Sequence, residues 1–135
     1  MNDTILFQFL KYNLVGVVNT LLGFGLVFTF LYLGINNMLS NFLGYFFGII
    51  LSFFLNKKYT FHKYKMTASI IWGFFTILMF AYLVNALIFW SIINYMDQSP
   101  YVSQIYSGIF YTLISFSLMK IFLFNNSNRK SNYEK

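Results

Sequence analysis

Four long apolar stretches, separated by short polar segments, dominate the chain. The stretches cover about residues 11–33, 39–56, 68–93 and 102–124. Each is long enough, as a helix, to cross the roughly 30 Å hydrocarbon core of a bilayer. The connections are 34–38, 57–67 and 94–101, and a polar tail that we expect to fray covers 125–135. The pattern predicts an all-α polytopic membrane protein, with residues 1–135 forming one domain of four transmembrane helices.

Small and polar residues recur at every fourth position of the second stretch, at Ser40, Gly44, Gly48, Ser52 and Asn56. A row with this spacing drifts by about 40° per step in an ideal helix. Gly44, Gly48 and Ser52 therefore nearly share one face, whereas Ser40 and Asn56 cannot share a straight one. Such rows are typical of close helix packing in membranes. We assign to helix packing the glycines Gly16, Gly44, Gly48 and Gly108.

Positive charge is concentrated at one end of the spans. Lys and Arg occur at Lys11, in the cluster at 57–65, at Lys120 near the end of the last span and in the tail, whereas the connections 34–38 and 94–101 contain neither. By the positive-inside rule, both termini and the loop 57–67 are cytoplasmic. The expected protein is a multi-pass membrane protein.

An internal repeat divides the chain into two halves. The segment 52–61, SFFLNKKYTF, matches the segment 115–124, SFSLMKIFLF, at a separation of 63 residues. Each half contains two spans, so the halves would have the same orientation in the membrane. The repeat predicts two parallel helical hairpins, related by an axis along the membrane normal, which is an arrangement found in transporters.

Composition excludes several classes of function. The chain is 59% hydrophobic, 9% charged and free of cysteine, which leaves no thiol nucleophile. The three acids are Asp3, Asp97 and Glu134, far from one another in sequence, and His62 is the single histidine. No acid–base pair or metal-ligand cluster results. We expect no catalytic residue, no metal and no cofactor. We also expect no nucleic-acid binding, because the cations lie at span ends rather than along a polar face.

Polar and cationic side chains in and beside the spans are the remaining candidates. The lysines at span ends could bind a phosphate as point charges, and this set is Lys11, Lys57, Lys58 and Lys120. Neutral donors and acceptors suited to hydroxyl groups would form a polar path of Asn19, Thr20, Ser52, Asn56 and Asn85. The simpler interpretation is that the lysines anchor span ends in the interface and that the amides bridge helices.

Two motifs resemble those of the GtrA-like family. The segment 11–20, KYNLVGVVNT, resembles its opening signature, in which a basic and an aromatic residue precede V-G-x-x-N-T. The segment 52–61, SFFLNKKYTF, is similar to its S-F-x-x-N-[RK]-x-[WY]-[TV]-F motif at the end of the second span. Two positions depart from the pattern: Gly23 stands where many relatives have an acid, and Met119 replaces an expected Asn. The matching residues are Lys11, Gly16, Asn19, Thr20, Asn56, Lys57 and Phe61.

The resemblance implies a protein of the cytoplasmic (inner) membrane. It would flip a polyprenyl-phosphate-linked sugar, such as undecaprenyl-phosphate glucose, for cell-surface polysaccharide or teichoic acid glycosylation. Its partners would be the sugar lipid and a membrane glycosyltransferase, and a homodimer would fit so narrow a bundle. Two alternatives stay open. A small multidrug exporter also has four spans, but it normally needs a membrane-embedded Glu that this chain lacks. A non-transporting subunit could instead dock a glycosyltransferase through the Gly/Ser row.

Overall fold

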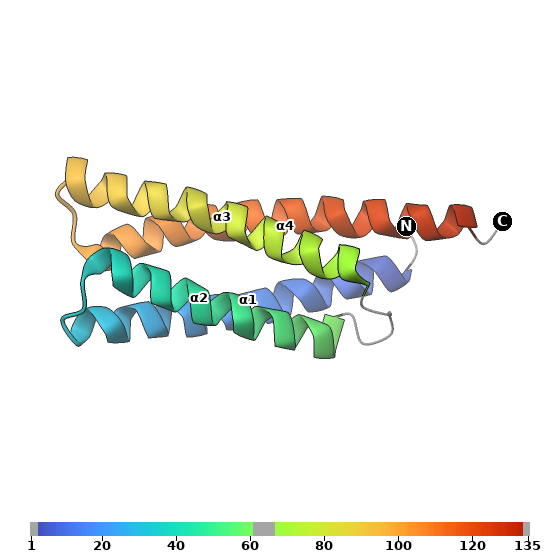
Figure 1. The fold of residues 1–135 in the computed structure, drawn as a ribbon, viewed down its shortest axis with the longest axis horizontal. Helices are drawn as coiled ribbons and strands as arrows, with labels where there is room; N and C mark the ends of the chain where they lie inside the picture. The colour runs from blue at the N-terminus through green and yellow to red at the C-terminus, as the bar shows by residue number, and fades with distance from the viewer. Residues whose placement is uncertain (1–2, 61–66, 134–135) are drawn as a thin grey trace.

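The computed structural model describes residues 3–60 and 67–133, and every regular element in these residues is helical (Figure 1). The elements are α1 (Asp3–Tyr32), α2 (Asn37–Leu55), the π-helical turn η1 (Asn56–Thr60), α3 (Ala68–Tyr95) and α4 (Pro100–Tyr133). Four of these helices are long and apolar enough to cross a membrane. The predicted all-α class with four spans is confirmed.

Local sequence explains where the helices begin and end. Gly34 adopts a φ of 78°, a conformation that favours glycine, and it follows the end of α1. The Asn36 side chain then caps α2 by accepting from the amides of Met38 (3.0 Å) and Leu39 (3.4 Å). Pro100 opens α4, where its missing N–H costs no helical hydrogen bond. These signals produce two tight turns between antiparallel helices.

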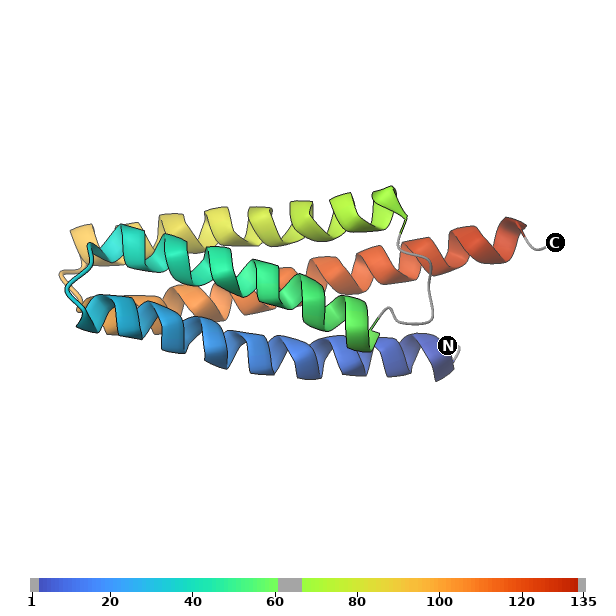
Figure 2. The same ribbon diagram turned by 60° about the horizontal axis from the view of Figure 1, so that its bottom comes forward.

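The helices form two hairpins that lie side by side. α1 packs extensively on α2, and α3 on α4, while α1 with α4 and α2 with α3 make smaller contacts. Figure 2 shows the connections 33–36 and 96–99 together at one end of the bundle, which we call the loop end. α1 begins and α4 ends at the opposite end, which we call the terminal end (Figures 1 and 2). α2 and α4 therefore run parallel to each other and occupy diagonally opposite positions in the bundle.

Burial along α2 and α4 reproduces the predicted repeat. The buried positions of α2 from Ser40 to Asn56, other than Ile49, each correspond to a buried position of α4 when 63 is added. In α2 they are Ser40, Asn41, Gly44, Tyr45, Gly48, Ser52 and Asn56, and in α4 Ser103, Gln104, Ser107, Gly108, Tyr111, Ser115 and Met119. The two hairpins thus present equivalent faces to the interior.

The burial pattern also corrects one geometric expectation. Ser40 is 0% exposed and Asn56 is 1% exposed, although a straight i+4 row cannot place both on one face. Both are buried because α2 contacts α1 on one side and α3 on another, and because Asn56 opens η1, which itself packs on α1. Large apolar side chains such as Leu21, Phe54 and Trp72 cover the outside, where a bilayer would contact them.

Two helices extend beyond the predicted spans. α1 begins at Asp3 rather than near Lys11, and α4 continues to Tyr133. The expectation that 125–135 would be a frayed tail is therefore wrong for 125–133. No Gly or Pro, the strongest helix-terminating residues, follows Gly108 in the sequence.

Candidate functional site

Four side chains form a closed hydrogen-bonded ring in the loop-end half of the bundle. Asn41 of α2 donates through Nδ2 to Asn85 Oδ1 (3.0 Å) and to Gln104 Oε1 (2.8 Å). The side-chain nitrogens of Asn85 and Gln104 then donate to the Tyr45 hydroxyl at 2.9 and 3.2 Å. We call Asn41, Tyr45, Asn85 and Gln104 the amide ring. It joins α2, α3 and α4, and its Asn41–Gln104 bond crosses the bundle diagonally.

The amide ring leaves polar groups unused at Asn41 and at Tyr45. Its three amide side chains are all 0% exposed, and Tyr45 is 9% exposed. Asn41 Oδ1 has no hydrogen-bond partner. The Tyr45 oxygen accepts two hydrogen bonds, so its own proton remains to be donated elsewhere. Burying such groups without partners is costly. A further polar group beside Asn41 Oδ1 or beside the Tyr45 hydroxyl would therefore be stabilising.

A small cavity lies beside Tyr45, toward the middle of the bundle. We call it the central cavity, and its lining residues are Asn19, Thr20, Gly23, Phe24, Gly44, Tyr45, Gly48 and Tyr111. All of them except Tyr111 come from the α1–α2 hairpin. Its volume of about 20 Å³ is enough for one water-sized group. The Tyr45 and Tyr111 rings, 4.7 Å apart, pack against each other at its edge.

Asn19 is the cavity's unpaired acceptor. Its side chain is only 8% exposed, and its Oδ1 has no hydrogen-bond partner. The glycines Gly23 and Gly48 face open space, because a Cβ built on either would have no atom within 4 Å. Two residues that line the cavity, Asn19 on α1 and Tyr45 on α2, thus carry an unused acceptor and an unused donor, respectively.

Closer to the terminal end, α2 finishes in a buried polar step. Asn56 Nδ2 donates to the Ser52 carbonyl oxygen (2.9 Å) and to Ser52 Oγ (3.3 Å). The backbone then forms the π-helical turn Asn56–Thr60. Such turns are rare in proteins, and those that occur often lie at functional sites. Together with the amide ring, these residues make a polar column along α2, defined as Ser40, Asn41, Tyr45, Ser52 and Asn56, with the central cavity at mid-depth.

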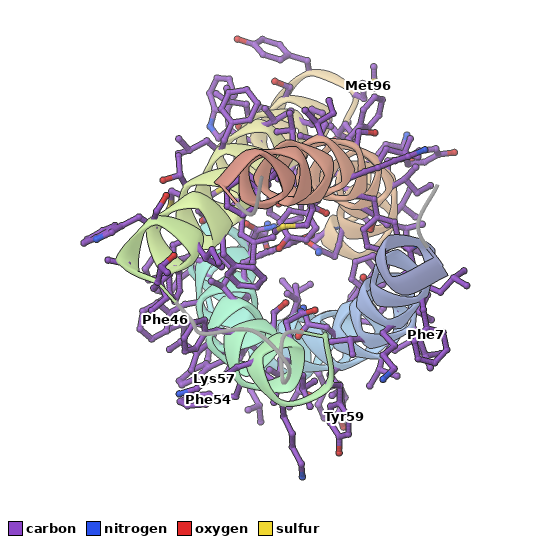
Figure 3. All side chains as sticks on the ribbon, turned by 90° about the vertical axis from the view of Figure 1, so that its right-hand side faces the viewer. Phe7, Phe46, Phe54, Lys57, Tyr59 and Met96 are labelled. Atoms are coloured by element: carbon purple, nitrogen blue, oxygen red, sulfur yellow. The ribbon has the colours of Figure 1, made fainter. Side chains whose placement is uncertain are left out.

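The predicted phosphate-binding lysines lie on the outside of the bundle. Lys57, Lys58 and Lys120 are exposed, and Lys11 is partly buried. Figure 3 shows Lys57 and Tyr59 pointing away from the bundle axis, on the same side as Phe54. Aromatic rings accompany two other lysines: Lys11 Nζ lies 4.6 Å from the Phe7 ring centre, and Lys58 Nζ lies 5.2 Å from that of Tyr59.

The structure thus distributes the predicted site residues over three places. Asn19 and Thr20 line the central cavity, Ser52 and Asn56 lie one step toward the terminal end, and Asn85 belongs to the amide ring. The four lysines do not join them in one cavity.

The four predicted packing glycines also differ from one another. A Cβ at Gly16, Gly44 or Gly108 would meet Phe116, Val27 or Phe24, respectively, whereas one at Gly48 would point into the cavity.

Sequence reasoning missed Asn41, Tyr45 and Gln104. A signal for two of them was present, because Asn41 and Gln104 are 63 residues apart, which is the separation of the repeat. Paired amides at equivalent depths of two parallel spans are expected to meet across a twofold axis.

Four apolar helices around a polar interior define a multi-pass membrane domain. Residues 11–124 match the family described as GtrA/DPMS, transmembrane domain. The chain belongs to this family, and the resemblance of its two motifs is confirmed. Comparisons with curated proteins and with solved structures find no match.

Proposed function

We propose that this protein flips a polyprenyl-phosphate-linked monosaccharide, such as undecaprenyl-phosphate glucose, from the cytoplasmic to the outer face of the cytoplasmic membrane. The sugar would then serve glycosylation of a cell-surface polysaccharide or teichoic acid. The observation that carries the proposal is the polar column along α2, with an unpaired, buried Asn19 acceptor beside it. Family membership supports the same function.

The exposed lysines fit a phosphate that stays at the membrane surface. The phosphate of a lipid-linked sugar lies among the lipid headgroups, outside the bundle rather than within it. Lys57 projects outward just after the end of α2, and Lys58 beside it is exposed, at the level where such a headgroup would lie. In this proposal they attract the phosphate as point charges, while the sugar enters the polar column.

Movement of the two hairpins would admit the sugar. The central cavity holds one water-sized group, so a whole sugar ring requires the bundle to open. The α1–α4 and α2–α3 contacts are smaller than the contacts within each hairpin. We expect the hairpins to part on the α1–α4 side, which leaves the amide ring between α2, α3 and α4 intact. Transport would be passive, drawn outward as the sugar is consumed outside.

The alternatives differ from this proposal in what they predict for purified protein. In proteoliposomes containing a labelled polyprenyl-phosphate sugar, a flippase exposes the sugar on the opposite leaflet. A subunit that only docks a glycosyltransferase does not, and a multidrug exporter would instead move an organic cation. Absence of protein-dependent exposure of any lipid-linked sugar would overturn the proposal.

Substitutions at the end of α2 test the phosphate and sugar roles. Lys57→Ala should lower the flipping rate by roughly two- to fivefold, the value of one partly solvated ion pair, whereas Lys57→Arg keeps the charge and the rate. Asn56→Ala should reduce flipping as well, while the protein stays folded and inserted, because it removes an amide that hydrogen-bonds Ser52 within its own helix turn. Wild-type rates in both alanine variants would remove these roles.

The proposed orientation can be tested because the chain has no cysteine. A membrane-impermeant thiol reagent should label Gln98→Cys, at the loop end, in intact cells. Ser131→Cys, near the end of α4, should be labelled only after permeabilisation. The reverse pattern would place the termini outside, against the positive-inside rule.

A further inference from the structure

We propose that the central cavity is a binding site for one sugar hydroxyl, which accepts a hydrogen bond from Tyr45 and donates one to Asn19. This inference rests on the proposed function and names the contacts that would read the sugar. In this inference Asn41, Asn85 and Gln104 are positioning residues, because they orient the Tyr45 hydroxyl that contacts the sugar.

The donor role of Tyr45 follows from its neighbours. A phenol can donate one hydrogen bond and accept up to two. Asn85 and Gln104 both donate to its oxygen, so both acceptor places are filled and the proton must point away from the amide ring. Asn41 fixes this direction, because it uses both of its N–H bonds to hold the acceptor oxygens of Asn85 and Gln104. The ring therefore presents a directed donor to a group outside it.

The acceptor role of Asn19 is independent of the ring. Asn19 lies on α1, its Oδ1 has no hydrogen-bond partner, and its side chain lines the same cavity as Tyr45. A hydroxyl is the group that can accept from a phenol and donate to an amide oxygen at once. A carboxylate or phosphate could only accept, so Asn19 would disfavour either in this cavity.

Water and a sugar hydroxyl share this chemistry, and a binding measurement separates them. The full chain in lipid nanodiscs is titrated with citronellyl phosphate and with a panel of citronellyl-phosphate hexoses. The measured quantity is the ratio of the two affinities, sugar-bearing over sugar-free, for the preferred hexose. A change in protein stability affects both probes alike and leaves the ratio unchanged.

Tyr45→Phe should lower this ratio by about five- to tenfold, the value of one or two hydrogen bonds to a buried group. Tyr82→Phe is the matched control. The Tyr82 ring packs 5.3 Å from that of Tyr45, but Tyr82 does not line the cavity, so the ratio should not change. Gln104→Leu should give a smaller loss of the ratio, since Tyr45 then regains a free acceptor place.

A second pair of variants keeps the test independent of Tyr45. Gly48→Ala places a methyl group in the cavity without touching any atom within 4 Å, so the fold is kept but the hydroxyl is displaced. Gly25→Ala adds the same methyl in open space outside the cavity. The affinity ratio should fall in the first variant only.

The outcomes distinguish the two proposals. If no sugar-bearing probe binds wild-type protein better than citronellyl phosphate, the proposed function fails and this inference fails with it. If wild-type protein prefers a hexose and both Tyr45→Phe and Gly48→Ala keep the full preference, the cavity holds only water. That result overturns the inference and leaves the proposed function standing.

Discussion

Replacing Gly44 by alanine should lower the free energy of unfolding by about 1–3 kcal/mol, the usual cost of overpacking a close-packed interior. A Cβ on Gly44 would collide with the Val27 side chain and would also approach the Val27 backbone nitrogen, 3.3 Å away. Val27 is 0% exposed, so neither group has room to move. α1 and α2 would have to separate locally, which weakens the most compact part of the first hairpin.

The measurement is unfolding by SDS titration in mixed micelles, followed by helical circular dichroism. Gly48→Ala is the control, since it is one turn away on the same helix and meets no atom within 4 Å. Its free energy of unfolding should stay within about 0.5 kcal/mol of wild type. Equal destabilisation by both substitutions would mean that glycine at these positions acts through backbone flexibility rather than through contact with Val27.

Replacing Asn41 by leucine should be comparably destabilising, by about 1–3 kcal/mol, because it removes the donors of two buried acceptors at once. Asn85 Oδ1 and Gln104 Oε1 would both lose the partner that the structure gives them. Hydrogen bonds between membrane helices contribute less free energy on average than expected for a water-free environment. Much of the destabilisation should therefore come from leaving the two buried oxygens without a donor. The readout is the same SDS titration.

A double substitution separates the amide ring from simple loss of packing. Asn41→Leu combined with Gln104→Leu should cost less than the sum of the single changes, because the second change removes an acceptor that the first had stranded. Asn94→Leu is the control. Its amide is exposed and bonds only to the Trp90 carbonyl oxygen at i−4, so its effect should be within about 0.5 kcal/mol. Strict additivity of the first pair would contradict a cooperative ring.

The helical class and the two hairpins could be predicted because they depend on the lengths of the apolar segments and on the charges between them. Apolar runs of membrane length and cations at alternate connections are visible in any reading of the sequence. The repeat was visible too, because Ser52 and Lys57 have counterparts in Ser115 and Lys120. Burial then follows the same shift of 63 residues along α2 and α4, since equivalent sequences make equivalent contacts.

The site was less predictable because it depends on which amides meet. Asn85 could be selected alone as a costly polar group in a span, but its partners Asn41 and Gln104 belong to no motif. The direction of Lys57 could not be predicted from helical periodicity either. The π-helical turn begins at Asn56 and has hydrogen bonds between residues i and i+5. Residues from Asn56 onward, including Lys57, therefore no longer follow the 3.6-residue period of α2.

The inexact repeat has a consequence for how a ligand can sit. Asn56 and Met119 occupy equivalent buried positions, 1% and 0% exposed, but only the first can hydrogen-bond strongly. The central cavity is likewise lined almost wholly by the α1–α2 hairpin. Two identical hairpins would offer a chiral guest two equivalent poses, related by half a turn about the membrane normal. Because Asn56 and Met119 differ in polarity and one hairpin supplies almost the whole cavity lining, this bundle breaks that degeneracy and favours a single pose.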